Sequence, residues 1–426
     1  MVFQKIWQRM GINFNMIKAK VLVYDTGWFV SVAQALVGQF EKVYYFCPWE
    51  SGYSDYIEEL PGVGIKGVEK VYKFWDIKNK IDLFVFTDYV FGDLQEELKR
   101  QGKLVWGFGN TNWLEEDRWN LRQWQKDNGL PYPPTTEVIG IDALKEEIKE
   151  GQFIKISRHR KTMETAKKFK GKTSEQFFDD LAVNLSVGKN EISINIEDPI
   201  KGEEPGYDTY TINGENPKLI LAGIEEKDEA YIGSWIPTTR LAKPMAKAND
   251  KLNELFKKEK ISAFHSTEFK MPNSNKAYLL DFTARMGNPP FPLYCAMIIN
   301  LGEIFYYGAQ GIMIQPKLKA KWGAIAIINS DFAKNNGIRF DVDEKIKDWL
   351  FVMNLCIIDG QICSLPIYGL SEIGAVVGIG NTMDIAIAEC KKHAEGISGY
   401  QLEIDTASLD KAKEKIIEAR KYGVIL

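Results

Sequence analysis

Five short apolar segments in the first 110 residues constrain the fold of this chain more than any other feature. Most are rich in β-branched or aromatic residues, which is typical of strands buried on both faces. Helix-like sequence follows the first segment (VSVAQALVGQF) and the fourth (GDLQEELKRQG). The segments are KVLVYD (20–25), VYYFC (43–47), a weaker VEKVY (68–72), IDLFVFTD (81–88) and KLVWGFG (103–109). This alternation predicts a parallel sheet covered by helices in an N-terminal domain, residues 1–112.

The length of 426 residues requires more than one hydrophobic core. A sharply basic stretch and an amphipathic helix-like segment after it predict a small lid subdomain at about 158–192. We place this lid within a central domain, residues 113–318. Short strands, turns and two helix-like segments then predict a C-terminal mixed α and β domain, residues 319–426.

Composition excludes several classes of protein. No run of 18 uncharged apolar residues is present, so we expect no membrane span. The N-terminal segment lacks an apolar signal-peptide core, and the five scattered cysteines form no CxxC pair, so we expect a reduced cytoplasmic protein. A net charge of -4 provides no general attraction for nucleic acid. Among the three histidines, we interpret His265 as a hydrogen-bonded structural residue rather than a base.

Two acidic residues in a predicted hairpin carry the most chemical information. If the loop MPNSNK (271–276) is centred between Ser274 and Asn275, Glu268 lies directly opposite Asp281. Opposed like charges destabilise a sheet unless they are neutralised, and a divalent cation would do so. A bulge at Pro272 would break this register.

Side chains alternate along a strand, so Asp281, Thr283 and Arg285 should share one face. Carboxylate and hydroxyl oxygens suit Mg²⁺, and an arginine binds phosphate through two parallel hydrogen bonds. The pattern therefore predicts a platform for a metal ion and a triphosphate. Two alternatives remain open, namely a solvated surface hairpin and a simple pair between Arg285 and Asp281.

At these residues the sequence resembles the ATP-grasp superfamily, and over nearly the whole chain it looks most like the glycinamide ribonucleotide synthetase branch. The closest local match is LLDFTARMGNPPF (279–291). The resemblance implies an α/β ATP-grasp fold with a Rossmann-like N-terminal domain, a small lid and a C-terminal α+β domain. It makes Glu268 and Asp281 metal ligands, places Thr283 where the family has asparagine, and puts Arg285 on phosphate as a catalytic residue.

Other positions match the family less specifically. Lys155, in the segment FIKIS, would contact the nucleotide and act in catalysis, although an exposed strand lysine is the alternative. Arg118 and Arg122 fall where the family has phosphate-binding lysines, or they decorate a solvated face. The remaining nucleotide ligands implied by the resemblance are Glu197 and Asp198 beside adenine, Glu204 near the ribose, and Lys227 beyond the hinge.

Two departures from the family pattern concern the lid and the acceptor. The glycine-rich loop that covers the phosphates is replaced by SRHRKTMETAKKFKGK (157–172), so Arg158 and Lys161 would bind phosphate there, unless this segment is a solvated loop. The turn YDTGWFVSVAQAL (24–36) lacks the family's phosphoribosylamine site. The acceptor is therefore open.

The resemblance implies an ADP-forming C–N ligase that uses ATP and Mg²⁺, with Mn²⁺ as an alternative metal. A carboxylate would attack the γ-phosphoryl group, and an amine would then attack the acyl phosphate, as in purine biosynthesis. We expect small-molecule acid and amine substrates, no membrane partner, and a monomer or homodimer. Two alternatives stay open, namely acyl transfer to a larger acceptor such as a modified nucleobase or peptide, and a silent ATP-binding protein.

Overall fold

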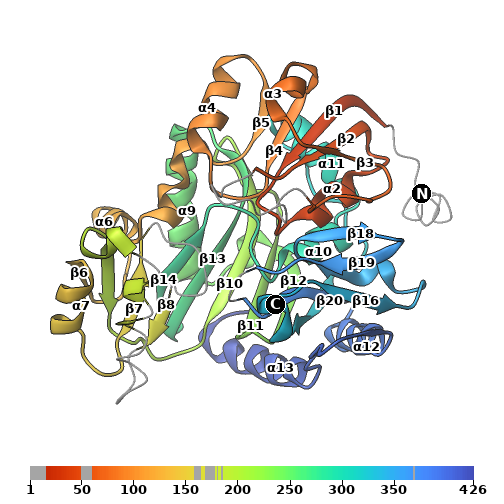
Figure 1. Ribbon diagram of the computed structural model, residues 1–426. Helices are drawn as coiled ribbons and strands as arrows, with labels where there is room; N and C mark the ends of the chain where they lie inside the picture. The colour runs from red at the N-terminus through yellow and green to blue at the C-terminus, as the bar shows by residue number, and fades with distance from the viewer. Residues whose placement is uncertain are drawn as a thin grey trace.

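The computed structural model describes residues 16–48, 60–157, 165–167, 178–179, 181–183, 186–367 and 370–426. Three regions are visible in the ribbon: an N-terminal sheet, a small sheet at one side, and a large sheet that continues to the C-terminal part (Figure 1). No helix in these ranges combines the length and the apolar character needed to cross a membrane.

The N-terminal sheet is parallel and has the strand order β3-β2-β1-β4-β5, which confirms the prediction from the alternating segments. The central strands β1 and β4 are almost wholly buried, as their continuous apolar sequence requires. The elements are β1 (Ile17–Tyr24), α2 (Val30–Leu36), β2 (Phe40–Phe46), β3 (Val68–Val71), α3 (Phe74–Ile77), β4 (Leu83–Phe86), α4 (Gly92–Arg100) and β5 (Leu104–Trp106). The order of the strands reverses between β1 and β4. In open α/β sheets ligands bind beyond the carboxyl ends of the strands at such a point, and we call this region the crevice.

The small sheet is antiparallel, has the order β6-β9-β7-β8, and packs its isoleucines and Val138 against α7 in a separate core. Two short helices lead into it from the N-terminal domain. The elements are α5 (Trp113–Glu116), α6 (Arg118–Asp127), β6 (Thr135–Ile139), α7 (Ile141–Glu147), β7 (Phe153–Ile156), β8 (Thr165–Lys167) and β9 (Ser193–Glu197). The lid predicted at about 158–192 overlaps this sheet, but residues 158–164 and most of 168–185 lie outside the described ranges.

The large sheet has eight strands in the order β14-β13-β10-β11-β12-β15-β20-β17. It crosses the boundary that we predicted at residues 318 and 319, because β12 pairs with β15 in antiparallel register. That boundary stays a prediction. The strands are β10 (Pro205–Ile212), β11 (Leu219–Glu226), β12 (Ala230–Pro237), β13 (Ser262–Asn273), β14 (Lys276–Thr283), β15 (Trp322–Asn329), β17 (Leu350–Val352) and β20 (Glu372–Gly380).

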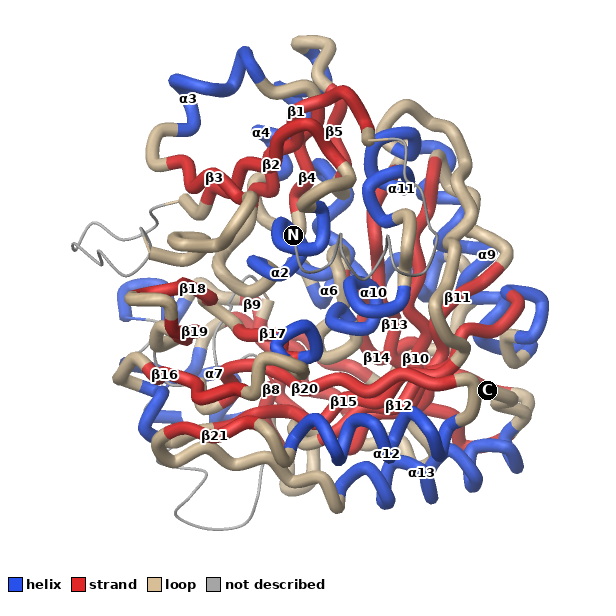
Figure 2. Tube along the Cα trace, turned by 90° about the vertical axis from the view of Figure 1, so that its right-hand side faces the viewer, coloured by secondary structure: helices blue, strands red, loops and turns tan. Residues whose placement is uncertain are grey.

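Helices cover both faces of the large sheet. Helices α12 and α13 lie side by side along its outer face, below β12 and β15 in Figure 2. A second small sheet, in the order β18-β19-β16-β21, completes the C-terminal part. The remaining elements are α9 (Lys243–Lys258), α10 (Phe291–Met297), α11 (Leu301–Gly308), β16 (Ile338–Val342), β18 (Leu355–Ile358), β19 (Gln361–Ser364), α12 (Met383–Ala394), β21 (Ile397–Gly399) and α13 (Ser408–Ala419).

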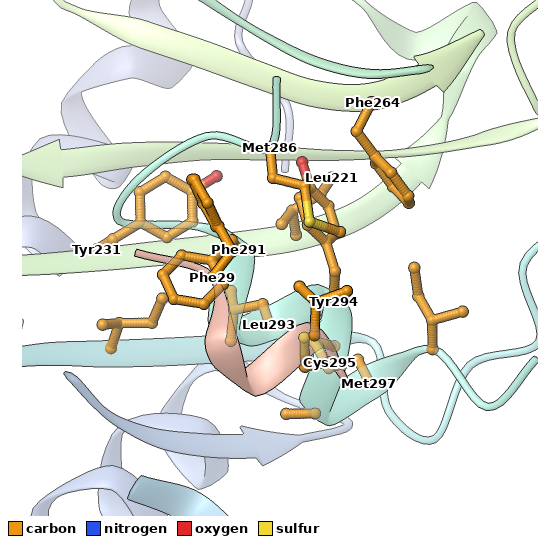
Figure 3. Close-up of a cluster of buried hydrophobic side chains, with 14 of the residues drawn as sticks. Phe29, Leu221, Tyr231, Phe264, Met286, Phe291, Leu293, Tyr294, Cys295 and Met297 are labelled. Atoms are coloured by element: carbon orange, nitrogen blue, oxygen red, sulfur yellow. The ribbon is translucent and has the colours of Figure 1, made fainter. Parts of the chain in front are cut away.

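A buried apolar cluster joins the N-terminal domain to the large sheet (Figure 3). Phe29, at the start of α2, meets Phe291 of α10 edge to face with 4.9 Å between ring centroids. Tyr231 of β12 lies over Gly223, where a Cβ atom would meet its hydroxyl oxygen at 2.3 Å. Because these side chains interlock, the end of β14, which precedes α10, is held against the N-terminal sheet.

Candidate active site

Glu268 and Asp281 are cross-strand partners, which confirms the predicted pairing. The hairpin is not the simple one that was assumed, however. Its register shifts once between Lys270 and Asn273, around Pro272, and shifts again between Glu268 and Phe269. The second shift offsets the first, so Glu268 and Asp281 face each other as a simple hairpin would place them.

Asp281 forms ion pairs with two basic side chains, one from α6 and one from β7. We call the place where α6 and the small sheet meet the end of β14 the junction. Lys155 of β7 donates from Nζ to Oδ2 of Asp281 at 2.6 Å, and Nη1 of Arg118 at the start of α6 donates to Oδ1. Burial lowers the pKa of the Lys155 ammonium to about 8, although the carboxylate of Glu197 opposes that effect. The small sheet and β14 are therefore joined by ion pairs at the place where a triphosphate was predicted.

A second set of ion pairs, formed by Glu197 with Arg122 and Lys155, is buried beside those of Asp281. Glu197 of β9 accepts from Nε of Arg122 at 2.8 Å and lies 3.6 Å from Lys155 Nζ. Burial raises the pKa of Glu197, but Lys155 and Arg122 outweigh it and hold that pKa below its usual value. Arg122 is 0% exposed, so its alternative reading as part of a solvated face is wrong.

The other carboxylate of the pair lies in acidic surroundings. Burial and a hydrogen bond with Glu204 raise the pKa of Glu268 to about 8. Burial would also raise the pKa of Glu204, yet its hydrogen bonds with Glu268 and Lys270 lower that pKa to about 2. Lys270 Nζ lies 2.5 Å from Oε2 of Glu204. The pKa values of these two neighbouring carboxyl groups thus shift in opposite directions, as expected for two acids that lie side by side in a buried place.

Arg285 does not take the role proposed in the simple-pair alternative. Its Nε donates to Oε1 of Glu115 at 3.1 Å and lies 3.4 Å from Oδ1 of Asp88. The other oxygen of Glu115 accepts from the backbone N–H of Ala284 at 2.8 Å. Asp281 pairs with Arg118 and Lys155 instead, so that alternative is wrong. Arg285 and Thr283 are partly buried, whereas Phe282 and Ala284, which alternate with them along the chain, are buried.

The other predicted site residues do not all contact this network. Asp198 is exposed and accepts from Gln152 Nε2 at 2.8 Å. Lys227 lies 3.9 Å from Glu225, and this carboxylate, despite the opposing effect of burial, raises the pKa of the lysine, helped by Glu268. Arg158 and Lys161 lie outside the described residues.

Three relevant residues were missed or misread. Glu115 and Asp88 bind Arg285, and only Asp88 had a local signal, since it ends the apolar segment IDLFVFTD. His265 is structural, as predicted, but the hydrogen bond expected of it is not found. Its ring stacks on Phe282 at 5.5 Å, and neither nitrogen has a partner among the described residues. Burial lowers its pKa to about 3, so the ring is neutral.

The donor set fits Mg²⁺ with a nucleotide rather than a metal ion held by protein alone. In the described ranges, no three His, Cys, Asp or Glu side chains gather closely enough to hold a metal ion. Mg²⁺ usually binds through one or two carboxylates and takes its other oxygens from phosphates and water. Glu268 and Asp281 provide such carboxylates, and Lys155 and Arg118 provide positive charge for phosphate beside them.

Comparisons with known proteins identify the fold. No family model matches the sequence, and no curated protein matches it. The structure is similar to phosphoribosylamine–glycine ligase from Thermotoga maritima, with a TM-score of 0.67, 14% identity, and coverage of 90% of this chain and 98% of that one. It is also similar to the biotin carboxylase domain of Hydrogenobacter thermophilus 2-oxoglutarate carboxylase in complex with MgADP, ADP and bicarbonate, with a TM-score of 0.65, 12% identity and coverage of 97% and 100%.

A third similar structure is L-amino acid ligase from Bacillus licheniformis, with a TM-score of 0.58, 13% identity, and coverage of 90% of this chain and 98% of that one. All three structures are ATP-grasp enzymes. The chain therefore has the ATP-grasp fold, as the resemblance of its hairpin residues implied. Within that fold, the ion-paired junction between the small sheet and β14 is the candidate active site.

Proposed function

We propose that the protein is an ATP- and Mg²⁺-dependent ligase that joins a carboxylate to an amine through an acyl phosphate. One observation carries the proposal: Asp281 faces Glu268 across two strands and is held by Lys155 and Arg118. This arrangement supports the proposal, because it brings two candidate oxygen ligands and two basic side chains to one junction of an ATP-grasp fold. Two of the similar structures are ligases and the third is a complex with MgADP, which supports this reaction class.

The ion pairs suggest how the site changes partners when substrate binds. Lys155 and Arg118 would move from Asp281 to the phosphate oxygens of ATP, because a triphosphate has more negative charge than one carboxylate. Asp281 would then be free to bind metal together with Glu268. Mg²⁺ supplies charge neutralisation for phosphoryl transfer. The protein's part is to position the γ-phosphoryl group and to keep water from the acyl phosphate.

The reaction is tested by measuring ADP release from the full chain with pooled carboxylic acids and amines, with and without Mg²⁺. We expect release only when metal, acid and amine are all present. Replacing Asp281→Asn together with Glu268→Gln should abolish it. The matched control is Asp384→Asn with Glu414→Gln, two exposed carboxylates of α12 and α13, which should leave turnover unchanged. Full turnover in the first double variant would refute the assignment, and tight ATP binding without ADP release would favour the silent alternative.

A second candidate function, acyl transfer to an acceptor other than phosphoribosylamine, is favoured by the turn after β1. In a parallel sheet, ligands bind beyond the carboxyl ends of the strands where the strand order reverses. At that place Asp25 is fully buried and accepts from Phe29 N–H at 3.0 Å, Tyr45 Oη at 2.8 Å and Thr87 Oγ1 at 2.9 Å. A carboxylate of the protein therefore uses the donors that would otherwise bind a phosphate.

Asp88 strengthens the argument, because it adds a second carboxylate to the crevice and pairs with Arg285. We infer that the acceptor carries no phosphate at this end. Phosphorylated and unphosphorylated amines, a modified nucleobase and peptides should be compared in the same ADP-release assay. Full activity with phosphoribosylamine and glycine would remove this second candidate and leave the first.

A further inference from the structure

A single extra residue in β14 decides which way Asp281 points. Phe269 pairs with Leu279, but the next residue on β13, Glu268, pairs with Asp281, so Leu280 is left without an opposite residue. This is a β-bulge, in which two residues of one strand oppose one residue of the other. Without it, Glu268 would face Leu280 and Asp281 would turn to the opposite side of the sheet.

At the bulge, the backbone carbonyl groups of Leu279 and Leu280 accept hydrogen bonds from side chains of α6 and β7. The carbonyl of Leu279 accepts from Gln125 Nε2 at 2.9 Å and from Arg122 Nη1 at 3.3 Å. The carbonyl of Leu280 accepts from Arg122 Nη2 at 2.6 Å and from Lys155 Nζ at 3.3 Å. A buried carbonyl without a donor is costly, so these contacts stabilise the bulged form of the strand.

Arg122 also binds two side chains beside the bulge. Besides the two carbonyls, Nε donates to Glu197 at 2.8 Å, Nη1 donates to Gln125 Oε1 at 2.8 Å, and Nη2 lies 2.8 Å from the same Glu197 oxygen. A guanidinium group has five N–H donors. Four hydrogen bonds of Arg122 go to Glu197, Gln125 and the two carbonyls, and its Nη2 lies against Glu197 as an ion pair. Glu197 also balances its charge, so Arg122 can remain buried. Because the side chain is 0% exposed, its guanidinium group is not presented to a phosphate.

We propose that Arg122, with Glu197 as its counter-ion, is a positioning residue that holds the β14 bulge and thereby keeps Asp281 opposite Glu268. It touches neither nucleotide nor metal. The consequence for metal binding rests on the proposed function, because that function makes Asp281 a ligand. The consequence for the strand does not, because it concerns the protein alone.

The experiment compares the full-length wild type with Arg122→Lys, whose single ammonium cannot reach both carbonyls and Glu197 together. Hydrogen exchange of the peptide 276–283, measured by mass spectrometry without ligand, should become about tenfold faster in this variant because a buried carbonyl loses its donor. The Mg²⁺ concentration for half-maximal ATP binding, measured by calorimetry, should rise about tenfold for the same reason. Arg339→Lys, a change at an exposed arginine bound to Gln361, should alter neither quantity.

Gln125→Met is a milder second variant in case Arg122→Lys does not fold. It removes one donor to Leu279 and should give a smaller change in the same direction. Exchange at the wild-type rate would overturn the proposal. Faster exchange with an unchanged Mg²⁺ requirement would support the role of Arg122 in the strand and would contradict the proposed function, which makes Asp281 a metal ligand. If the wild type releases no ADP with any substrate, the proposed ligase function fails, whereas the exchange data still decide the role of Arg122.

Discussion

The two ends of the junction around β14 use charge in opposite ways. Near Asp281, two basic side chains from Arg118 and Lys155 surround one carboxylate. Near Arg285, two carboxylates from Asp88 and Glu115 surround one guanidinium. The first end has positive charge that a triphosphate can take over, and the second has negative charge that repels an anion. We infer from this difference that nucleotide binds at the Asp281 end and that the crevice beside Arg285 receives a substrate group without phosphate, which departs from the phosphate contact expected of Arg285.

The largest expected effect comes from removing positive charge at the Asp281 end. Lys155→Met should lower turnover by about 100- to 1,000-fold, the range typical of losing one charged group that stabilises a transition state. Steady-state ADP release with the substrates found in the screen is the measurement. Lys145→Met, which removes an exposed lysine of α7, is the matched control and should behave like the wild type. Equal turnover in both variants would contradict the contrast between the two ends.

The next effect concerns Asp25, the buried carboxyl of the crevice. Burial raises its pKa from 3.8 to about 6, so the folded state binds its proton more tightly than the unfolded state does. The contribution of Asp25 to stability is thus fully present below about pH 4 and is lost as the pH rises through about 6. The loss amounts to about 2 to 3 kcal/mol.

This pH dependence is checked by urea unfolding of wild type and Asp25→Asn at several pH values between 4 and 7. The variant cannot ionise, so the wild type should lose more stability than the variant across that interval. Parallel curves for the two proteins would show that Asp25 does not titrate in the crevice. The offset between the curves is a separate quantity, since asparagine also changes the hydrogen bonds with Tyr45, Thr87 and Phe29.

A smaller effect is expected for Glu115→Gln at the Arg285 end. The amide keeps an oxygen for Ala284 N–H but removes one of the two negative charges around Arg285. We expect KM for the amine to rise about tenfold, with KM for ATP changed much less, because one charge-assisted hydrogen bond is lost at this end only. Initial rates at varied amine and varied ATP separate the two constants. A larger change in KM for ATP than in KM for the amine would indicate that nucleotide binds at the Arg285 end, which would contradict the comparison.

The smallest effect should follow His265→Phe, a change in the core beside Phe282 of β14. The histidine ring lies among Phe282 and Phe256 without a hydrogen bond to any described residue, so another ring should change stability at pH 8 by about 1 kcal/mol or less. Its pKa is lowered to about 3, so the wild type gains stability as the pH rises from about 3 towards 6.5. The variant should lack that gain in urea unfolding at pH 5 and pH 8. A loss of several kcal/mol at pH 8 would mean that the ring nitrogens have a partner.

Local patterns in the sequence were enough for the parallel sheet and for the carboxylate pair. Continuous apolar segments indicate buried parallel strands, and the two-residue repeat of a strand places Asp281, Thr283 and Arg285 on one side. The pairing of Glu268 with Asp281 was correct although the hairpin contains two register shifts, because these shifts offset each other. The roles of these residues in binding metal and nucleotide stay predictions.

Tertiary structure alone decided which charges meet. Arg118 and Asp281 are 163 positions apart, Arg122 and Glu197 are 75 apart, and Arg285 and Glu115 are 170 apart. Hydrophobic periodicity reports which face of an element is buried, but it holds no information about the partner that a distant fold brings to that face. The sequence by itself therefore determined the strands and the faces of the candidate site. Packing of the small sheet, the N-terminal domain and β14 against one another determined its ion pairs, because electrostatic contacts depend on distance in space rather than along the chain.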